Sequence, residues 1–109
     1  MGKKARTPAP IERRIAVRHL TGKRRGAIVK TEVHSRENEV VKYSLAYINP
    51  RISSLDNGRI LGYDNSHGHH HRHFMGEVSS VNFTGYAVLL KRFQKEVNEL
   101  WRHEDEAKN

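Results

Sequence analysis

The spacing of apolar residues changes once along this chain, near residue 84, and this change constrains the fold more than any other feature. Before it, apolar and polar side chains alternate in short runs separated by turn residues, which is the two-residue period of half-buried β-strands. After it, apolar side chains recur every three or four residues, which is the period of an amphipathic α-helix. The sequence therefore predicts several strands followed by one long helix.

The expected strands differ in how clearly they alternate. Residues 39–48 are the clearest, because β-branched and aromatic side chains share one parity and suit a pleated, half-buried surface. Residues 11–20 are less regular because Arg13 interrupts the pattern, so an amphipathic helix stays open there. Asn57-Gly58 is a hairpin-turn dipeptide that precedes another strand. The segments expected as strands are residues 11–20, 27–34, 39–48, 59–64 and 77–83.

The segment after residue 84 is expected to be a helix that packs on the sheet. Thr84 is its expected N-cap, because a threonine hydroxyl can accept a hydrogen bond from an amide of the first turn. On the polar side, Arg92 and Glu96 stand four residues apart and are expected to pair in water. The apolar stripe consists of Tyr86, Leu89, Leu90, Phe93, Val97, Leu100 and Trp101.

The predicted fold class is α+β: an antiparallel β-meander of four or five strands with one long C-terminal helix packed on it. The 109 residues suffice for a single domain, expected over residues 11–102. A flexible basic arm is expected at residues 1–10 and a frayed tail at residues 103–109. The chain has no cysteine, which excludes disulfides and thiolate zinc sites. No membrane-spanning run or signal-peptide pattern is present, so a cytoplasmic protein is expected.

The positive charge is concentrated at one end of the chain. The formal net charge is +8, yet residues 1–30 hold ten Lys and Arg against one Glu. That segment therefore carries +9, and the other 79 residues sum to −1. Such asymmetry indicates a phosphate backbone or an acidic protein as partner. The cations expected to bind nucleic acid are Arg13, Arg14, Arg18, Lys23, Arg24, Arg25 and Lys30.

Five of the eight histidines fall within residues 67–73, directly after a segment expected to be a strand. A purification tag explains this cluster poorly, because Gly68 and Arg72 interrupt it and it does not lie at a terminus. Histidine exchanges protons near neutral pH and is also a common metal ligand. The cluster is therefore the expected functional centre.

Metal-independent RNA cleavage is one chemistry that this cluster could perform. Attack of a 2′-hydroxyl on the adjacent phosphate needs a general base, a general acid and a cation for the developing charge. His71 and His73 are expected to transfer the protons, and Arg72 to hold the scissile phosphate with its planar guanidinium. Asp64 is expected to orient a histidine. Tyr63 could donate a proton or simply pack.

Two other interpretations of the cluster stay open. If residues 69–73 form a strand, His69, His71 and His73 share one face and could bind zinc or another divalent metal, with Asp64 or His67 as a further ligand. That site would be structural, or it would serve a metal-dependent nuclease or hydrolase. Alternatively, the protein is a non-enzymatic nucleic-acid-binding or regulatory module, and its histidines only pack or form hydrogen bonds.

Three runs of the sequence also carry a family resemblance. They are Lys42-Tyr43-Ser44-Leu45-Ala46-Tyr47, residues 58–65 with their Tyr-Asp-Asn end, and His70-His71-Arg72-His73-Phe74. They resemble the TumE family of toxins from bacterial toxin–antitoxin pairs, over residues 25–102. In that family the Tyr-Asp-Asn strand leads into a His-rich segment, and a helix of the Phe-x-x-x-Val type follows, matched here by Phe93 and Val97. This chain departs from the pattern in being denser in histidine.

The resemblance implies a small growth-inhibiting protein whose partner is a helix-turn-helix antitoxin. Small toxins of comparable size often cleave mRNA, so RNA is the substrate that the resemblance implies. The favoured hypothesis is thus a toxin that acts as a ribonuclease without a cofactor, through Asp64, His71, Arg72 and His73. The sheet edge could also receive a strand of the antitoxin or of a second copy, giving a homodimer.

Overall fold

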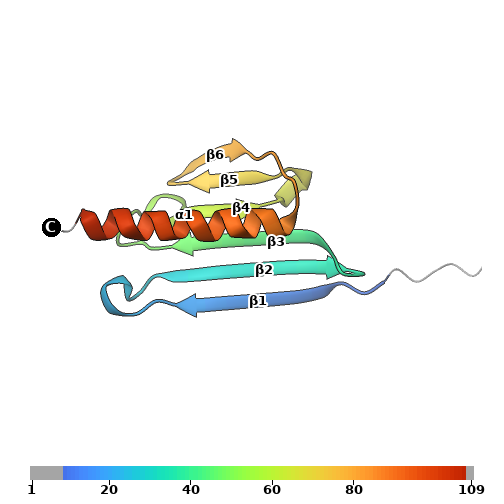
Figure 1. Cartoon of the computed structure of the whole chain (residues 1–109), viewed down its shortest axis with the longest axis horizontal. Helices are drawn as coiled ribbons and strands as arrows, with labels where there is room; N and C mark the ends of the chain where they lie inside the picture. Colours follow the sequence, from blue (N-terminus) through green and yellow to red (C-terminus); the bar gives the residue numbers. More distant parts are fainter. Residues whose placement is uncertain (1–8, 108–109) are drawn as a thin grey trace, which may run out of the picture.

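Six antiparallel strands form one sheet, and a single long helix lies across one face of it (Figure 1). The computed structural model describes residues 9–107. The strands lie in the sheet in the order of the sequence, so each pairs with its neighbours along the chain. The elements are β1 (Glu12–His19), β2 (Ile28–Arg36), β3 (Glu39–Ile48), β4 (Arg59–Asp64), β5 (His71–Phe74), β6 (Glu77–Ser80) and α1 (Tyr86–Glu106).

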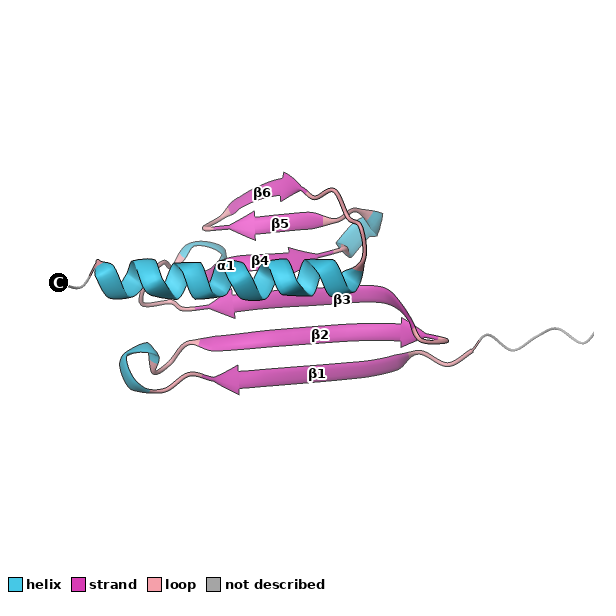
Figure 2. Cartoon of the chain, viewed as in Figure 1, coloured by secondary structure: helices cyan, strands magenta, loops and turns pink. Residues whose placement is uncertain are grey.

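The predicted α+β meander with a C-terminal helix is confirmed, with six strands instead of four or five. The additional strand is β5, which the His cluster forms between β4 and β6 (Figure 2). Residues 11–20 contain a strand, which removes the helix alternative for that segment. The basic arm expected at residues 1–10 lies mostly outside the described residues.

Strand register divides the side chains between two faces of the sheet. Tyr63 pairs with Leu45 of β3 and with Arg72 of β5, so these three residues lie on the face that carries α1, called here the helix face. Asp64 pairs with Ser44 and His71, which therefore lie on the opposite face, called here the open face. Neighbours in sequence thus have different surroundings, because successive side chains of a strand alternate.

The core lies on the helix face, between α1 and the central strands β3 and β4. Its largest side chains are aromatic, and Tyr63 meets Phe93 of α1 edge-on with ring centroids 6.3 Å apart, a favourable arrangement for aromatic pairs. A helix about 10 Å wide covers roughly two strands spaced about 4.8 Å apart. The strand β1 consequently stays exposed along its whole length.

Both ends of α1 differ from the expected ones. The N-cap is Gly85 and not Thr84: Gly85 has φ 137°, which glycine accommodates best, and no side chain caps this end. At the other end the helix continues to Glu106, past residue 103 from which a frayed tail was expected. The guanidinium of Arg24 stabilises this last turn by donating to the Trp101 carbonyl at 2.8 Å and to Asp105 at 2.9 Å. Within residues 9–107, no helix is both long enough and apolar enough to cross a membrane.

Packing of α1 on the sheet can be tested with two adjacent helix residues. Leu89 is 4% exposed and Val88 is 59% exposed. We expect Leu89→Ala to lower the free energy of unfolding by about 2–5 kcal/mol, because it removes buried methyl groups and leaves a cavity. Val88→Ala should change it by less than about 0.5 kcal/mol. Urea denaturation followed by circular dichroism measures both, and equal losses would contradict the packing described.

Candidate active site

The three residues Tyr63-Asp64-Asn65 lie at the end of β4, and their side chains point in different directions. Tyr63 enters the core on the helix face, and Asp64 lies on the open face. The Asn65 side chain accepts a hydrogen bond from the Tyr43 amide and donates one to the Val41 carbonyl, both at 3.0 Å. These bonds continue the pairing with β3 beyond the last residue of β4. The triplet therefore fixes the position from which the chain enters the His cluster.

Asp64 is the centre of a group of polar side chains on the open face. It is 8% exposed, and its Oδ2 lies 2.7 Å from Nε2 of His73. Its Oδ1 accepts a hydrogen bond from the Ser66 amide at 3.1 Å and lies 3.7 Å from Nδ1 of His71. The Arg59 guanidinium is 3.8 Å from Oδ2. One carboxylate thus has two histidines beside it, and the nearby arginine donates a hydrogen bond to a second carboxylate, Asp56, at 2.6 Å.

The charge state of Asp64 determines which nitrogen of His73 carries hydrogen. Burial acts to raise the pKa of Asp64, but the hydrogen bond from Ser66 and the neighbouring His73 outweigh it, so this pKa lies below its ordinary value. Asp64 is therefore ionised at neutral pH and can only accept hydrogen bonds. The Nε2 of His73 must be the donor, which leaves Nδ1 free to take a proton.

Arg59 reaches the open face because β4 contains a bulge. Tyr47 pairs with Leu61 and Ile48 pairs with Arg59, so Ile60 is an extra residue that reverses the alternation. Gly62 gives the Arg59 side chain room to cross β4. A Cβ on this glycine would lie 2.7 Å from Cδ of Arg59. The sequence did not predict Arg59 as a site residue, because regular alternation places it on the face opposite Asp64.

Arg72 is not part of this group, so the expected grouping of Arg72 with Asp64, His71 and His73 is not found in the structure. It lies between His71 and His73 in β5, so alternation places its side chain on the helix face. There its Nη2 donates to Glu96 at 2.7 Å, and its Nε donates to the Tyr63 hydroxyl at 3.2 Å. Arg72 thus links the sheet to α1.

Glu96 is the second residue that the sequence did not assign to this region. The pair expected with Arg92 is present at 3.9 Å, but Glu96 also accepts hydrogen bonds from Arg72 and from the Tyr63 hydroxyl. Burial and the bond to Glu96 raise the pKa of Tyr63 to about 12, so its hydroxyl stays protonated and serves as a donor in the core. The position of Glu96, three residues after Phe93 of the apolar stripe, is the signal that could have indicated this role.

The remaining histidines of the cluster lie elsewhere. His70 stacks on Phe83 with ring centroids 3.9 Å apart, and its Nδ1 is 2.8 Å from the Tyr43 hydroxyl. The rings of His69 and His71 are 6.1 Å apart. In the part of the chain that the structure describes, no three His, Asp or Glu side chains converge on a possible metal position. The convergence expected of His69, His71 and His73 is therefore not found.

The cations expected to bind nucleic acid are divided among three places. By register, Arg13 and Lys30 lie on the open face, whereas Arg14 and Arg18 lie on the helix face. Arg24 is held by the last turn of α1, as described above. Of its neighbours in the turn after β1, Lys23 lies 2.9 Å from Asp105, and Arg25 is exposed.

Comparison with known proteins gives one match. The family model described as Toxin TumE matches residues 5–101, which include every strand, most of α1 and all four residues of the Asp64 group. Comparisons with curated proteins and with solved structures found no match. A match over nearly the whole chain shows membership, so this protein belongs to the TumE toxin family.

Proposed function

We propose that this protein is the toxin of a toxin–antitoxin pair and that it inhibits growth by cleaving RNA without a metal. The observation that carries the proposal is the arrangement on the open face: an ionised Asp64 bonded to His73, with His71 and Arg59 beside it. Family membership supports the toxin assignment. A helix-turn-helix antitoxin is the proposed protein partner, and the cytoplasm, where mRNA is available, is the proposed place of action.

The proposed reaction needs one imidazole on each side of a phosphodiester. Nδ1 of His73 takes the proton of the 2′-hydroxyl, and the 2′ oxygen attacks phosphorus. The bond from phosphorus to the 5′ oxygen then breaks, and a protonated His71 gives its proton to that oxygen. Products are a 2′,3′-cyclic phosphate and a 5′-hydroxyl end. The two rings lie 6.2 Å apart, and Arg59 supplies the positive charge for the developing phosphorane.

The open face also offers a path for the RNA backbone. Register places Lys30, Ala46, Gly62 and His73 in one row across β2, β3, β4 and β5. Ala46 keeps the surface low beside Lys30, and the Arg59 side chain lies over Gly62 beside His73. Lys42 of β3 lies on the same face. We therefore assign Lys30 and Lys42 to phosphate binding, together with Arg13.

The first test is cleavage of labelled RNA in excess chelator. We expect His73→Gln to lower the cleavage rate by roughly 10²-fold or more, which is the usual contribution of a positioned general base. Asp64→Asn should lower it because the asparagine amide no longer fixes the protonated nitrogen of His73. His69→Gln is the matched control, since His69 is an exposed histidine of the same cluster outside the hydrogen-bonded group.

The pattern of results distinguishes the competing hypotheses. Equal cleavage by wild type, His73→Gln and His69→Gln would contradict the site. Cleavage that disappears with chelator and returns with added zinc would support a metal-dependent nuclease instead. Tight RNA binding without any cleavage would support the non-enzymatic binding module.

The second test compares cations on opposite faces. We expect Lys30→Gln combined with Lys42→Gln to weaken binding of a single-stranded RNA and to reduce the salt slope of log K by roughly 0.7 for each lost phosphate contact. Arg14→Gln combined with Arg18→Gln, which removes the same charge from the helix face, should have a smaller effect. Fluorescence anisotropy over a range of salt concentrations measures both. A larger loss in the helix-face variant would show that RNA binds there.

A third test examines the Asp64 pairing through stability. The pKa of Asp64 is lowered by folding, so the native state binds fewer protons than the unfolded chain near the ordinary Asp pKa of about 4. The lowered pKa of Asp64 therefore contributes to the free energy of unfolding above that pH. This contribution is lost as the pH falls through the lowered native pKa. We expect urea unfolding at pH 7 and at pH 3 to show a smaller acid-induced loss in Asp64→Asn than in wild type. Identical losses would contradict the pairing.

A further inference from the structure

The helix face has an uncovered part beside α1. The helix packs on β3 and β4, and the described residues of β1 and β2 have no helix above them (Figure 1). The surface of β2 in this region is formed by Val29, Thr31 and Val33, which are only partly buried. We call the space between β1 and α1, above these three residues, the β1–α1 groove.

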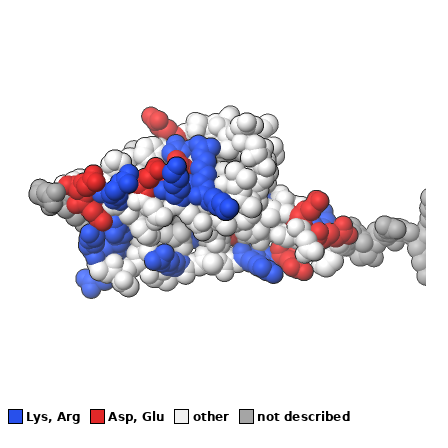
Figure 3. Space-filling model, in the orientation of Figure 1, with Lys and Arg blue, Asp and Glu red and all other residues white. Residues whose placement is uncertain are grey.

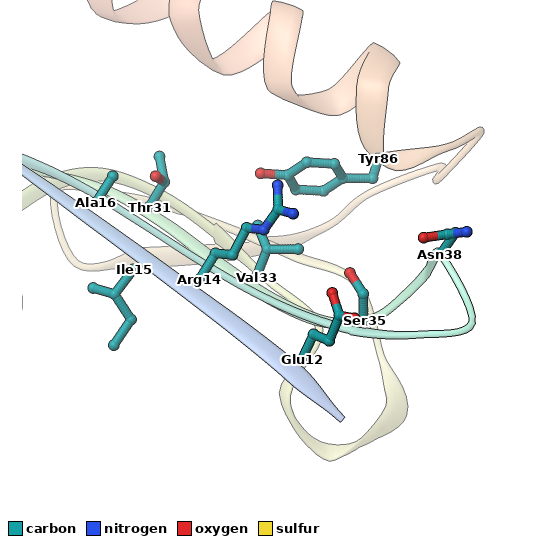
Figure 4. A pocket seen from close by; sticks show the side chains of 9 residues that line it. All are labelled: Glu12, Arg14, Ile15, Ala16, Thr31, Val33, Ser35, Asn38 and Tyr86. Carbon is teal, nitrogen blue, oxygen red and sulfur yellow. The ribbon is translucent and has the colours of Figure 1, made fainter. Parts of the chain in front are cut away.

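Two separate hollows lie along the groove, one near each end of α1. The first, of about 460 Å³, lies between Arg14 of β1 and the Tyr86 ring at the start of α1 (Figure 4). The second, of about 400 Å³, is lined by Arg18, Val29 and Trp101. Tyr86 and Trp101 lie fifteen positions apart on α1, which corresponds to about 22 Å at 1.5 Å per residue.

The width of the groove suits one further helix. The line midway between β1 and β2 lies two strand spacings from the line midway between β3 and β4. This distance is about 9.6 Å. Packed helices lie about 8–10 Å apart. A second helix could therefore rest on β1 and β2 and contact α1 at the usual distance. About 15 residues would fill the length between Tyr86 and Trp101.

The charged side chains around the β1–α1 groove indicate which kind of helix it would bind. Arg14 and Arg18 extend from β1 into the groove, and the Arg18 guanidinium lies 5.7 Å from the centroid of the Trp101 ring on α1. Figure 3 shows Lys and Arg side chains over both the α1 side and the β1 side of this face.

On the α1 side, the uncharged side chains of Gln94 and Asn98 line the groove. Lys91 lies seven residues before Asn98 and Arg102 four residues after it, so helical spacing places both exposed cations on the same side of α1. This side is the outer rim of the groove. Glu12 at one end is the acidic exception among the residues that line the two hollows.

We propose that the β1–α1 groove binds an acidic amphipathic helix of a partner protein. Apolar side chains of that helix, spaced as i, i+3, i+4 and i+7, contact Val29, Val33 and the aromatic rings of Tyr86 and Trp101. Its carboxylates face Arg14 and the other rim cations. A second copy of this chain fits less well as the occupant. Its β1 and the exposed side of its α1 carry the same cations, which the cations of the groove would repel. RNA also fits less well, because the floor is aliphatic and the guanidiniums of Arg18 and Arg24 already lie over the Trp101 ring on which a base would stack.

This inference is independent of the proposed function. The groove lies on the helix face, and the Asp64 group lies on the open face. A partner in the groove leaves Asp64, His71 and His73 uncovered. Peptide binding and RNA cleavage can therefore fail separately.

The test uses two synthetic peptides of about 15 residues with the same leucine spacing, one with Glu and the other with Lys at the polar positions. Trp101 is the only tryptophan and lines the groove, so its emission reports binding directly, and anisotropy of a labelled peptide gives the affinity. We expect saturable binding of the Glu peptide alone. Arg14→Glu combined with Arg18→Glu should weaken it by roughly tenfold or more and should permit binding of the Lys peptide.

Matched variants on the same strands provide the control. Arg13→Glu combined with Lys30→Glu places the same charge change on the open face and should alter peptide affinity by less than about twofold. Ala16→Phe fills the groove and should weaken binding without changing any charge. Val17→Phe, on the opposite face of β1, should not. Circular dichroism confirms that each variant is folded.

Four results would overturn the proposal. One is the absence of saturable Glu-peptide binding, and a second is equal weakening of that binding by the open-face and groove variants. Another is concentration-dependent self-association that Arg14→Glu with Arg18→Glu abolishes, which would make a second copy the occupant. The last is loss of RNA binding in the groove variant with no change in the open-face variant, which would make RNA the occupant.

Discussion

The register between β4 and β5 is the constraint on which the candidate site depends. It places Tyr63 opposite Arg72 on the helix face and Asp64 opposite His71 on the open face. A slip by one residue would exchange the two faces, moving Arg72 toward the open face and the histidines toward the core. Two carboxylates oppose such a slip. Asp64 binds His73 on the open face, and Glu96 binds Arg72 on the helix face.

The contact between Glu96, Arg72 and Tyr63 has an energetic role as well as a positional one. All three groups are partly or fully buried, so each would lose hydration without compensation if its partners were absent. In the native register each has a hydrogen-bonding partner. Any alternative register therefore leaves a buried charge unpaired, which disfavours it far more than the loss of one surface ion pair would. The rigid β4–β5 pair that results is a suitable support for proton transfer, which requires fixed distances.

The sequence allowed the fold to be predicted because hydrophobic period is a local property. Alternation in β3 and the recurrence of apolar residues every three or four positions in α1 are visible without tertiary information, and both elements are present in the structure. The histidine cluster also drew attention to Asp64, His71 and His73, which do lie together. Its conformation was harder to predict, because β5 has no apolar alternation to identify it as a strand. Arg72 was consequently grouped with its sequence neighbours, although strand geometry separates it from them.

Arg59 shows why the rest of the site could not be predicted. Its place beside Asp64 results from the extra residue Ile60 and from the missing side chain of Gly62, and neither has a recognisable meaning before the β3–β4 register is known. Glu96 is similar, since a helix position that looks exposed becomes partly buried only when β5 lies beneath it. Periodicity can assign a residue to a face, but bulges and helix docking decide which faces meet.

The two uncovered surfaces of this small sheet differ in chemistry, and this difference argues for two separate partners. One helix cannot cover six strands, so part of each face stays accessible. The open face is polar near its centre, with Asp64, small side chains and lysines, which suits a solvated phosphate backbone. The β1–α1 groove has an aliphatic floor between two cationic rims, which suits a helix with one apolar and one acidic side. The positive charge of the first thirty residues is divided between these two surfaces, because alternation along β1 sends Arg13 to one face and Arg14 to the other.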